Sequence, residues 1–165
     1  WAQNRLNSIT RDDEYLNQCP RQVKKYIMIE YLFDDIIYKH RSFFNTDETK
    51  KSKFLYDVCF GFKPQKFDQQ ESVNLIIDEE NEVTDMYFIQ EGCIGIGYYL
   101  LSQGLSTKQY DLGIEVKNNH FICDYYVCHN KKSEFIYICV ENVEAIALSK
   151  SYLVDYLFQK YPKIG

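Results

Sequence analysis

The spacing of apolar residues divides the chain into a helical first part and a strand-rich second part. Between residues 21 and 40, apolar side chains recur at intervals of three and four, the period of a helix with a broad buried face. Pro20 suits the first turn of this helix, where an N–H group has no partner within the helix. A shorter helix is expected over residues 49–60, after the capping sequence Asn45-Thr46-Asp47-Glu48.

Beyond Pro64 the apolar period changes to two, the period of a strand whose faces alternate between core and solvent. Strands are expected over residues 72–77, 86–89, 93–100, 110–116, 135–140 and 143–148. Glu91-Gly92 is expected to form a hairpin-like turn between two of these strands, and Glu141-Asn142 between another two.

The chain closes with a further helix, which begins at Ser149 or Ser151 and ends at Pro162. Helices, then about eight short strands, then one helix predict an α+β fold class. We expect N-terminal linker helices followed by a small, jelly-roll-like antiparallel β-barrel with flanking helices. Gly95-Ile96-Gly97 is a lone GxG inside a strand and predicts a close-packing point, not a nucleotide loop.

Composition excludes several classes of protein. The sequence has 165 residues, of which 45% are apolar and 16% aromatic, so disorder along its whole length is excluded. A net charge of −5 argues against a broad basic surface for nucleic acid, so no nucleic-acid partner is expected. No apolar run approaches the roughly 18 residues of a membrane helix. Trp1 stands where an initiator Met would, so we expect a piece of a longer protein.

The cysteines are spaced too irregularly for a disulfide framework, and we expect reduced thiols that mostly fill the core. They are Cys19, Cys59, Cys93, Cys123, Cys128 and Cys139. The nearest approach to a metal cluster is His120, Cys123, Cys128 and His129, but the chain has no CxxC pair, so no metal site is predicted. A His–Cys nucleophile pair there would lack a carboxylate to orient the base, so we do not expect an enzyme.

Four parts of the sequence carry a resemblance to a known family. They are LNQCPRQV at 16–23 with IIYKHRSFF at 36–44, then FL at 54–55 through FGFKPQKF at 60–67, DMYFIQEGCIGI at 85–96, and ALSK through YP at 147–162. On these residues the chain resembles the cyclic nucleotide-binding domain behind the pore of cyclic nucleotide-regulated and ether-à-go-go-type cation channels.

The resemblance implies an organisation and a setting. Residues 1–45 would be the helical C-linker and residues 46–165 the β-barrel domain, without the lid helix that follows it in the family. The chain would then be a cytosolic regulatory and assembly module of a tetrameric cation channel, of the potassium or the cyclic nucleotide-regulated type. Its partners would be neighbouring subunits, and it would meet the membrane only through an upstream pore region.

The resemblance also locates a candidate ligand site. In the family, the phosphate of the nucleotide lies at the N-terminus of a short helix, next to a Phe-Gly-Glu segment and an arginine. The matching candidate residues here are Phe121, Ile122, Cys123, Asp124, Lys132 and Ser133. Lys132 or, with a shift of one residue, Ser133 stands where the family has its arginine.

These positions depart from the family pattern. Ile122 replaces glycine, Cys123 replaces glutamate with Asp124 one residue later, and Glu134 would repel a phosphate. Losing the phosphate pair and the ribose carboxylate would cost about 1.5–3 kcal/mol each, which moves micromolar binding towards millimolar. The sequence therefore predicts a degenerate pocket with no cofactor, in which cAMP or cGMP binds weakly if at all.

Three other interpretations stay open at the level of sequence. One is a working cAMP or cGMP sensor that has rebuilt its pocket with Asp124 and Lys132. Another is a non-channel signalling protein with the same domain, such as a kinase regulatory subunit or a membrane exchanger. The third is an aromatic-rich binding surface formed by Tyr87, Tyr98, Tyr99, Tyr125, Tyr126 and Tyr137.

Overall fold

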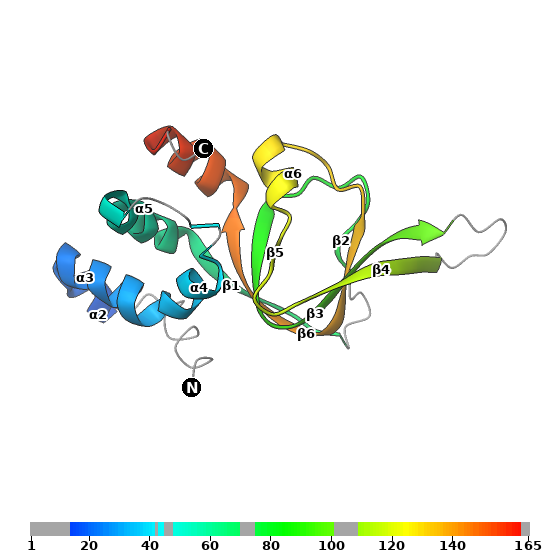
Figure 1. Ribbon diagram of the computed structural model, residues 1–165, viewed down its shortest axis with the longest axis horizontal. Coiled ribbons are helices and arrows are strands. Elements are labelled where there is room, and N and C mark those ends of the chain that lie inside the picture. Colours follow the sequence, from blue (N-terminus) through cyan, green and yellow to red (C-terminus); the bar gives the residue numbers. More distant parts are fainter. Residues whose placement is uncertain (1–13, 42, 45–47, 70–74, 101–108, 163–165) are drawn as a thin grey trace. The chain divides into compact units, whose positions relative to one another are not determined.

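The structure is a computed structural model that describes residues 14–41, 43–44, 48–69, 75–100 and 109–162 (Figure 1). The chain forms two compact units. The helical unit consists of Trp1–Pro64 with Ile146–Gly165, and the sheet unit consists of Gln65–Ala145. The expected domain boundary after residue 45 and most of the expected cap before residue 48 lie outside the described residues.

The helical unit contains both ends of the described chain. Its helices are α2 (Glu14–Gln18), α3 (Arg21–Ile27), the π-helical turn η1 (Met28–Leu32), α4 (Asp34–Lys39), α5 (Glu48–Gly61) and the π-helix η2 (Ser151–Phe158). Pro20 occupies the N-cap of α3, one residue before the helix that it was expected to begin. Among the residues described, no helix has both the length and the apolarity needed to cross a membrane.

The single helix expected over residues 21–40 is interrupted. Phe33 leaves helical geometry, with φ −117° and ψ 5°, and its N–H donates to the carbonyl of Met28 at 3.0 Å. The break buries the Phe33 ring to 2% exposure, edge-on to Phe62 at 5.1 Å between ring centroids. Burial of a large aromatic side chain offsets the lost helical hydrogen bonds, and the apolar spacing alone does not reveal such a break.

The other two expected helices are confirmed. α5 runs from Glu48 to Gly61, and a Cβ at Gly61 would overlap the ring of Tyr152, so glycine permits this close approach to η2. The hydroxyl of Ser149 accepts a hydrogen bond from the N–H of Tyr152 at 3.3 Å, which supports the start of η2. Leu153 is fully buried on the inner stripe of η2.

Six antiparallel strands form one sheet. They are β1 (Phe62–Phe67), β2 (Leu75–Ile77), β3 (Asp85–Leu100), β4 (Gln109–Lys117), β5 (Phe121–Ile122) and β6 (Ile136–Ser149), in the order β1-β6-β3-β4 with β2 on β6 and β5 on β3. The α+β class is confirmed. Within the residues described, however, there are six strands where about eight were expected, and the sheet is not closed into a barrel.

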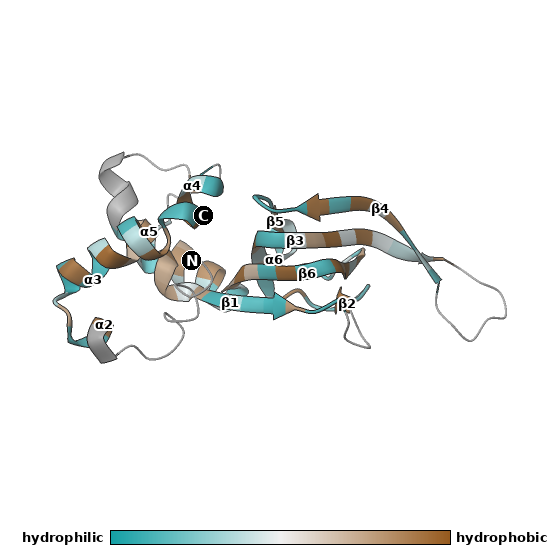
Figure 2. Ribbon diagram, turned by 90° about the horizontal axis from the view of Figure 1, so that it is seen from below, coloured by the Kyte–Doolittle hydropathy of each residue, from teal (hydrophilic) through white to brown (hydrophobic). Residues whose placement is uncertain are grey.

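The outer strand β1 carries Pro64 and is hydrophilic along most of its length (Figure 2). A proline suits an edge strand, because its nitrogen has no hydrogen to donate to a neighbour. The core of the sheet unit lies instead on β3 and β6, where Met86, Phe88, Ile94 and Ile136 have no exposed surface.

Neither of the two expected turns interrupts its strand. β3 continues through Glu91-Gly92 and β6 continues through Glu141-Asn142. Gly92 has φ +94°, and a Cβ there would overlap the carbonyl oxygen of Asn142. Glycine at position 92 therefore lets β6 approach closely, and its left-handed conformation lies within a continuous strand and not in a hairpin turn.

Other expectations for this part of the chain are confirmed. β4 covers the strand expected over residues 110–116, and residues 75–77 of the strand expected over 72–77 form β2, its first residues lying outside the described chain. A Cβ at Gly97 would overlap the carbonyl oxygen of Asp111, which confirms the close-packing point. Four of the six cysteines are buried and all six are free thiols.

Candidate functional site

The segment expected to hold a phosphate forms a strand end followed by a short helix. Phe121 and Ile122 make up β5, and α6 runs from Asp124 to His129. Between them Cys123 has φ +71°, in the left-handed region that favours glycine. The short helix lies where the family resemblance places one. The left-handed residue is Cys123, while Ile122 has ordinary strand geometry and is buried opposite Tyr87.

The side chain of Cys123 is buried and faces other protein groups. Its exposure is 4%, and burial raises the pKa of the thiol to about 12. The thiol is hydrogen-bonded to the hydroxyl of Tyr137. A neutral buried thiol offers no counterpart to the glutamate that the family places at this position, because it carries no charge and its partner is already a protein hydroxyl.

This thiol and three tyrosines linked to it directly or through one another form what we call the tyrosine–cysteine cluster, namely Tyr87, Cys123, Tyr126 and Tyr137. Burial raises the pKa of Tyr137 well above its usual range, and its hydroxyl is hydrogen-bonded to Tyr126 as well as to Cys123. Tyr126 also accepts the N–H of Glu134 at 3.4 Å. Burial raises the pKa of Tyr87 to about 12, and Cys123 is among the groups that act on it.

The burial of two of these tyrosines corrects part of the prediction of an aromatic binding surface. Tyr126 and Tyr137 have exposures of 6% and 5%, so they belong to the interior, whereas Tyr98 and Tyr125 are exposed. The cluster draws on β3, α6 and β6, which are far apart in sequence, so no local pattern could have assembled it.

The two residues expected in place of the arginine differ in their burial and in their contacts. Ser133 is 1% exposed, and its hydroxyl donates to the carbonyl of Phe135 at 2.6 Å. Its N–H donates to the carbonyl of Asn81 at 3.0 Å. Lys132 is exposed and forms an isolated backbone bridge with Glu82; within the described chain its ammonium group makes no hydrogen bond or ion pair. Ser133 is thus occupied by protein contacts, and Lys132 lies at the surface.

The two histidines of this region contact Tyr125 and the backbone of Asn118. The ring of His129 lies 4.8 Å from that of Tyr125, and His120 Nδ1 lies 3.2 Å from the carbonyl of Asn118. Burial raises the pKa of Cys128, whereas an activated thiol needs a lowered one. In the described part of the chain, no group of three or more His, Cys, Asp or Glu side chains could hold a metal ion.

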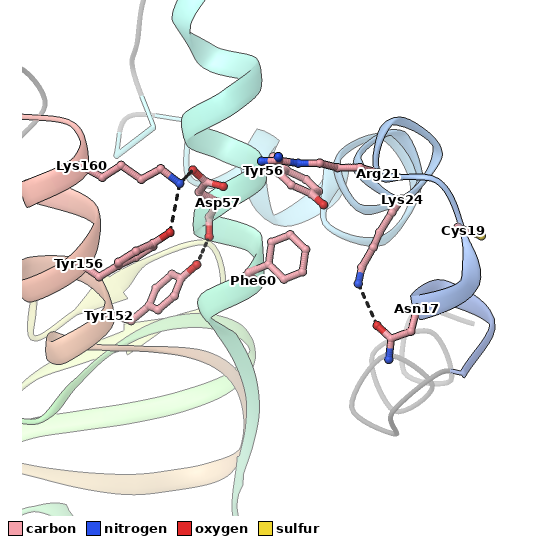
Figure 3. Close-up of a pocket in the computed structure, with 10 residues that line it drawn as sticks. All are labelled: Asn17, Cys19, Arg21, Lys24, Tyr56, Asp57, Phe60, Tyr152, Tyr156 and Lys160. Carbon is pink, nitrogen blue, oxygen red and sulfur yellow. Dashed lines mark hydrogen bonds and ion pairs between the residues drawn. The ribbon is translucent and has the colours of Figure 1, made fainter.

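A second candidate site, which sequence reasoning missed, is a cavity of about 580 Å³ in the helical unit (Figure 3). Its walls come from the α2–α3 segment, α5, η2 and Lys160 just after η2. Asp57 lies in its wall: its carboxylate accepts the hydroxyl of Tyr161 at 2.5 Å and pairs with Lys160 at 2.7 Å. The carbonyl of Asp57 accepts the hydroxyl of Tyr152 at 2.5 Å.

These contacts keep Asp57 ionised. Burial pushes the pKa of its carboxyl upward, but hydrogen bonds from Lys160 and Tyr161 and the charge of Arg21 outweigh burial, so the pKa lies below its ordinary value. The same pairing raises the pKa of Lys160. The wall of the cavity therefore contains a stable ion pair throughout the neutral range of pH.

Comparison with known proteins supports the fold alone. No family model matches the sequence, and no curated protein matches it either. Among solved structures, the catabolite activator protein of Thermus thermophilus superposes with a TM-score of 0.53 at 12% sequence identity. The match covers 68% of this chain and 48% of that one, so this chain spans about half of the length of its structural neighbour. Over the matched region the chain shares the fold of the catabolite activator protein.

Proposed function

We propose that this chain, built on a cyclic nucleotide-binding fold, is a regulatory and assembly module whose nucleotide pocket is degenerate. The parent protein is a tetrameric cation channel, and the module lies on the cytoplasmic face of its membrane. The fold supports the general class, and the sequence resemblance of residues 16–44 to a channel linker supports the setting. The module acts through contacts with neighbouring subunits and performs no catalysis.

The tyrosine–cysteine cluster is the observation that carries the degenerate pocket. Cys123 and Tyr126 both act on the buried Tyr137 hydroxyl, and the Ser133 hydroxyl donates to the carbonyl of Phe135. A cyclic nucleotide entering this segment would have to break such bonds. Each buried polar group left without a partner costs about 1–3 kcal/mol. Binding would therefore have to offset this loss without the family's arginine and glutamate.

The assembly role rests on the surface of the linker helices. Val23, Tyr26, Tyr31 and Tyr38 are exposed on the segment from α3 to α4, with Tyr38 at 66% exposure. Apolar side chains gathered on short helices are typical of surfaces that pack against a partner. Neighbouring copies of the same segment would cover them in the tetramer that we propose.

Calorimetric titration with cAMP and cGMP tests the degenerate pocket. We expect no saturable heat up to millimolar nucleotide, because two charge-assisted contacts of the family are lost. Each such contact contributes about 1.5–3 kcal/mol, so their loss lowers the affinity by a hundredfold or more. Saturable micromolar binding that the Asp124→Asn and Lys132→Gln variants abolish would contradict the proposal and favour the rebuilt sensor. The Lys131→Gln variant, next to Lys132 and bonded to Tyr125 at 2.5 Å, is the matched control.

A further inference from the structure

The cavity of the helical unit combines positive charge with aromatic walls. Arg21, Lys24 and Lys160 line it together with a single carboxylate, that of Asp57. The whole chain carries a net charge of −5, so the local excess of positive charge in the cavity is opposite in sign to the net charge of the protein. A concave site with an excess of one sign of charge concentrates ligands of the opposite sign.

The carboxylate of Asp57 forms an ion pair with only one of these three cations. Asp57 is paired with Lys160 at 2.7 Å, and its side chain is 8% exposed. Lys24 donates to the side-chain oxygen of Asn17 at 3.0 Å, which leaves its charge unneutralised. Arg21 acts on Asp57 through its charge, but its guanidinium makes no hydrogen bond within the described chain. Figure 3 shows Arg21 extending from α3 towards Asp57 on α5.

Two aromatic side chains of the cavity each have a lysine ammonium group over one face of the ring. Phe60 and Tyr156 line the cavity and are about half exposed. The Lys24 ammonium lies 5.1 Å from the centre of the Phe60 ring, and that of Lys160 lies 5.3 Å from the centre of the Tyr156 ring. Half-exposed rings next to charged groups are the surfaces on which planar ligands stack.

From this arrangement we infer that the helical unit carries a binding site for a small aromatic anion, a flat ring that bears a phosphate or a carboxylate. Arg21 and Lys24 hold the anionic group, because a guanidinium matches two oxygens of a phosphate or carboxylate at once. Phe60 and Tyr156 contact the ring. The volume of about 580 Å³ lies within the range of small-molecule sites, about 300–1,000 Å³.

This site is independent of the proposed degenerate pocket. The pocket segment, residues 121–133, belongs to the sheet unit, whereas every residue that lines the cavity belongs to the helical unit. The two ideas can therefore fail separately. Within the cavity wall, the carboxylate of Asp57 is buried and paired with the partly exposed Lys160.

Titration of the 165-residue chain with phenyl phosphate, followed by protein NMR, tests the inference. We expect saturable binding, with shifts confined to the residues of the cavity. The Arg21→Gln and Lys24→Gln variants should each weaken binding by about tenfold, the usual effect of one charge-assisted contact. Lys25→Gln changes a lysine on the same helix that does not line the cavity, and this variant should bind as the wild type does.

Two further probes separate the ring from the anion. Cyclohexyl phosphate and inorganic phosphate carry the same charged group without an aromatic ring, so both should bind more weakly than phenyl phosphate. Equal affinity for inorganic phosphate would overturn the inference, as would equal weakening by Lys25→Gln and Arg21→Gln or the absence of saturable binding. Arg21 is exposed and is the smallest of the influences that lower the pKa of Asp57, so its substitution should lower the thermal midpoint of unfolding only slightly. A loss of binding with a nearly unchanged midpoint is then local to the cavity.

Discussion

At the scale of single residues, Asp57 joins two distant parts of the chain. Its carboxylate binds Lys160 and Tyr161, the latter 104 residues further along, and its carbonyl binds Tyr152. Nothing in the sequence around Asp57 distinguishes it from a surface acid on a helix, because its partners lie in η2 and in the residues just after it. Buried charge of this kind is retained only where hydrogen bonds satisfy it on several sides.

We expect Asp57→Asn to lower the free energy of unfolding by about 1–3 kcal/mol at pH 7, since the change removes the charge that Lys160 and Tyr161 bind. The matched control is Asp35→Asn, which breaks the pair of Lys39 with Asp35 at 2.7 Å on an exposed helix face. That change should cost less than about 0.5 kcal/mol. Urea denaturation of the three proteins measures both effects, and equal losses would contradict the role of Asp57.

The same substitution has a pH signature. The pKa of Asp57 in the folded state lies below its ordinary value of 3.8, so its contribution to stability is present above pH 3.8 and is lost as the pH falls through the folded value. The difference in unfolding free energy between wild type and Asp57→Asn should therefore stay level from pH 7 to about pH 5 and shrink below pH 3.8. A difference that grew in acid would show that the carboxyl is protonated in the folded protein.

At the scale of elements, close approach of backbones shapes the sheet. β3 pairs with β4 from Cys93↔Lys117 to Leu100↔Gln109, with an irregularity of register between Ile96 and Gly97. At that point the backbone of Asp111 lies so close to Gly97 that any side chain would overlap it. The alternation of apolar residues predicted a strand here, and the glycine spacing predicted the contact. The partner strand and the register are set by tertiary pairing.

Gly97→Ala should therefore destabilise the protein by about 1–3 kcal/mol, because the neighbouring group is backbone and cannot move aside as a side chain can. Gly113→Ala is the control on the partner strand, where a Cβ would meet nothing within 4 Å. Its effect should stay within about 0.5 kcal/mol. The thermal midpoints of unfolding of both variants measure the two effects. Similar midpoints would contradict the prediction and show that β3 and β4 can move apart at Gly97 at little cost.

At the scale of the whole molecule, the helices from α3 to α4 present the surface through which we propose that copies associate. Tyr26 and Tyr31 pack edge-to-face at 5.7 Å on this surface, and Tyr38 is the most exposed of its aromatic residues. The chain should self-associate at high concentration, and Tyr38→Ser should weaken this association. Sedimentation equilibrium measures it. Tyr110→Ser, which removes an exposed tyrosine of β4, should leave the association unchanged. Equal effects of the two substitutions would contradict an interface on the helices from α3 to α4.

The candidate pocket shows what the sequence could and could not indicate. Resemblance located the short helix α6, and the replacement of the family's glycine, glutamate and arginine could be read directly from residues 121–134. The burial of Tyr126 and Tyr137 around Cys123 could not be read there. A tyrosine suits a core and a surface equally well, and only the packing of neighbouring elements decides which environment it has.

By itself, the sequence determined the α+β class, the helices around α5 and η2, the strand β4 and the close approach at Gly97, because these depend on local period, capping and the size of one residue. The tertiary structure decided the rest. It broke the long helix at Phe33 to bury an aromatic ring, and it carried β3 and β6 through expected turns. It also enclosed Asp57 beside a cationic cavity. Each of these depends on contacts between residues far apart in the chain, whose free energy exceeds the preferences of the local sequence.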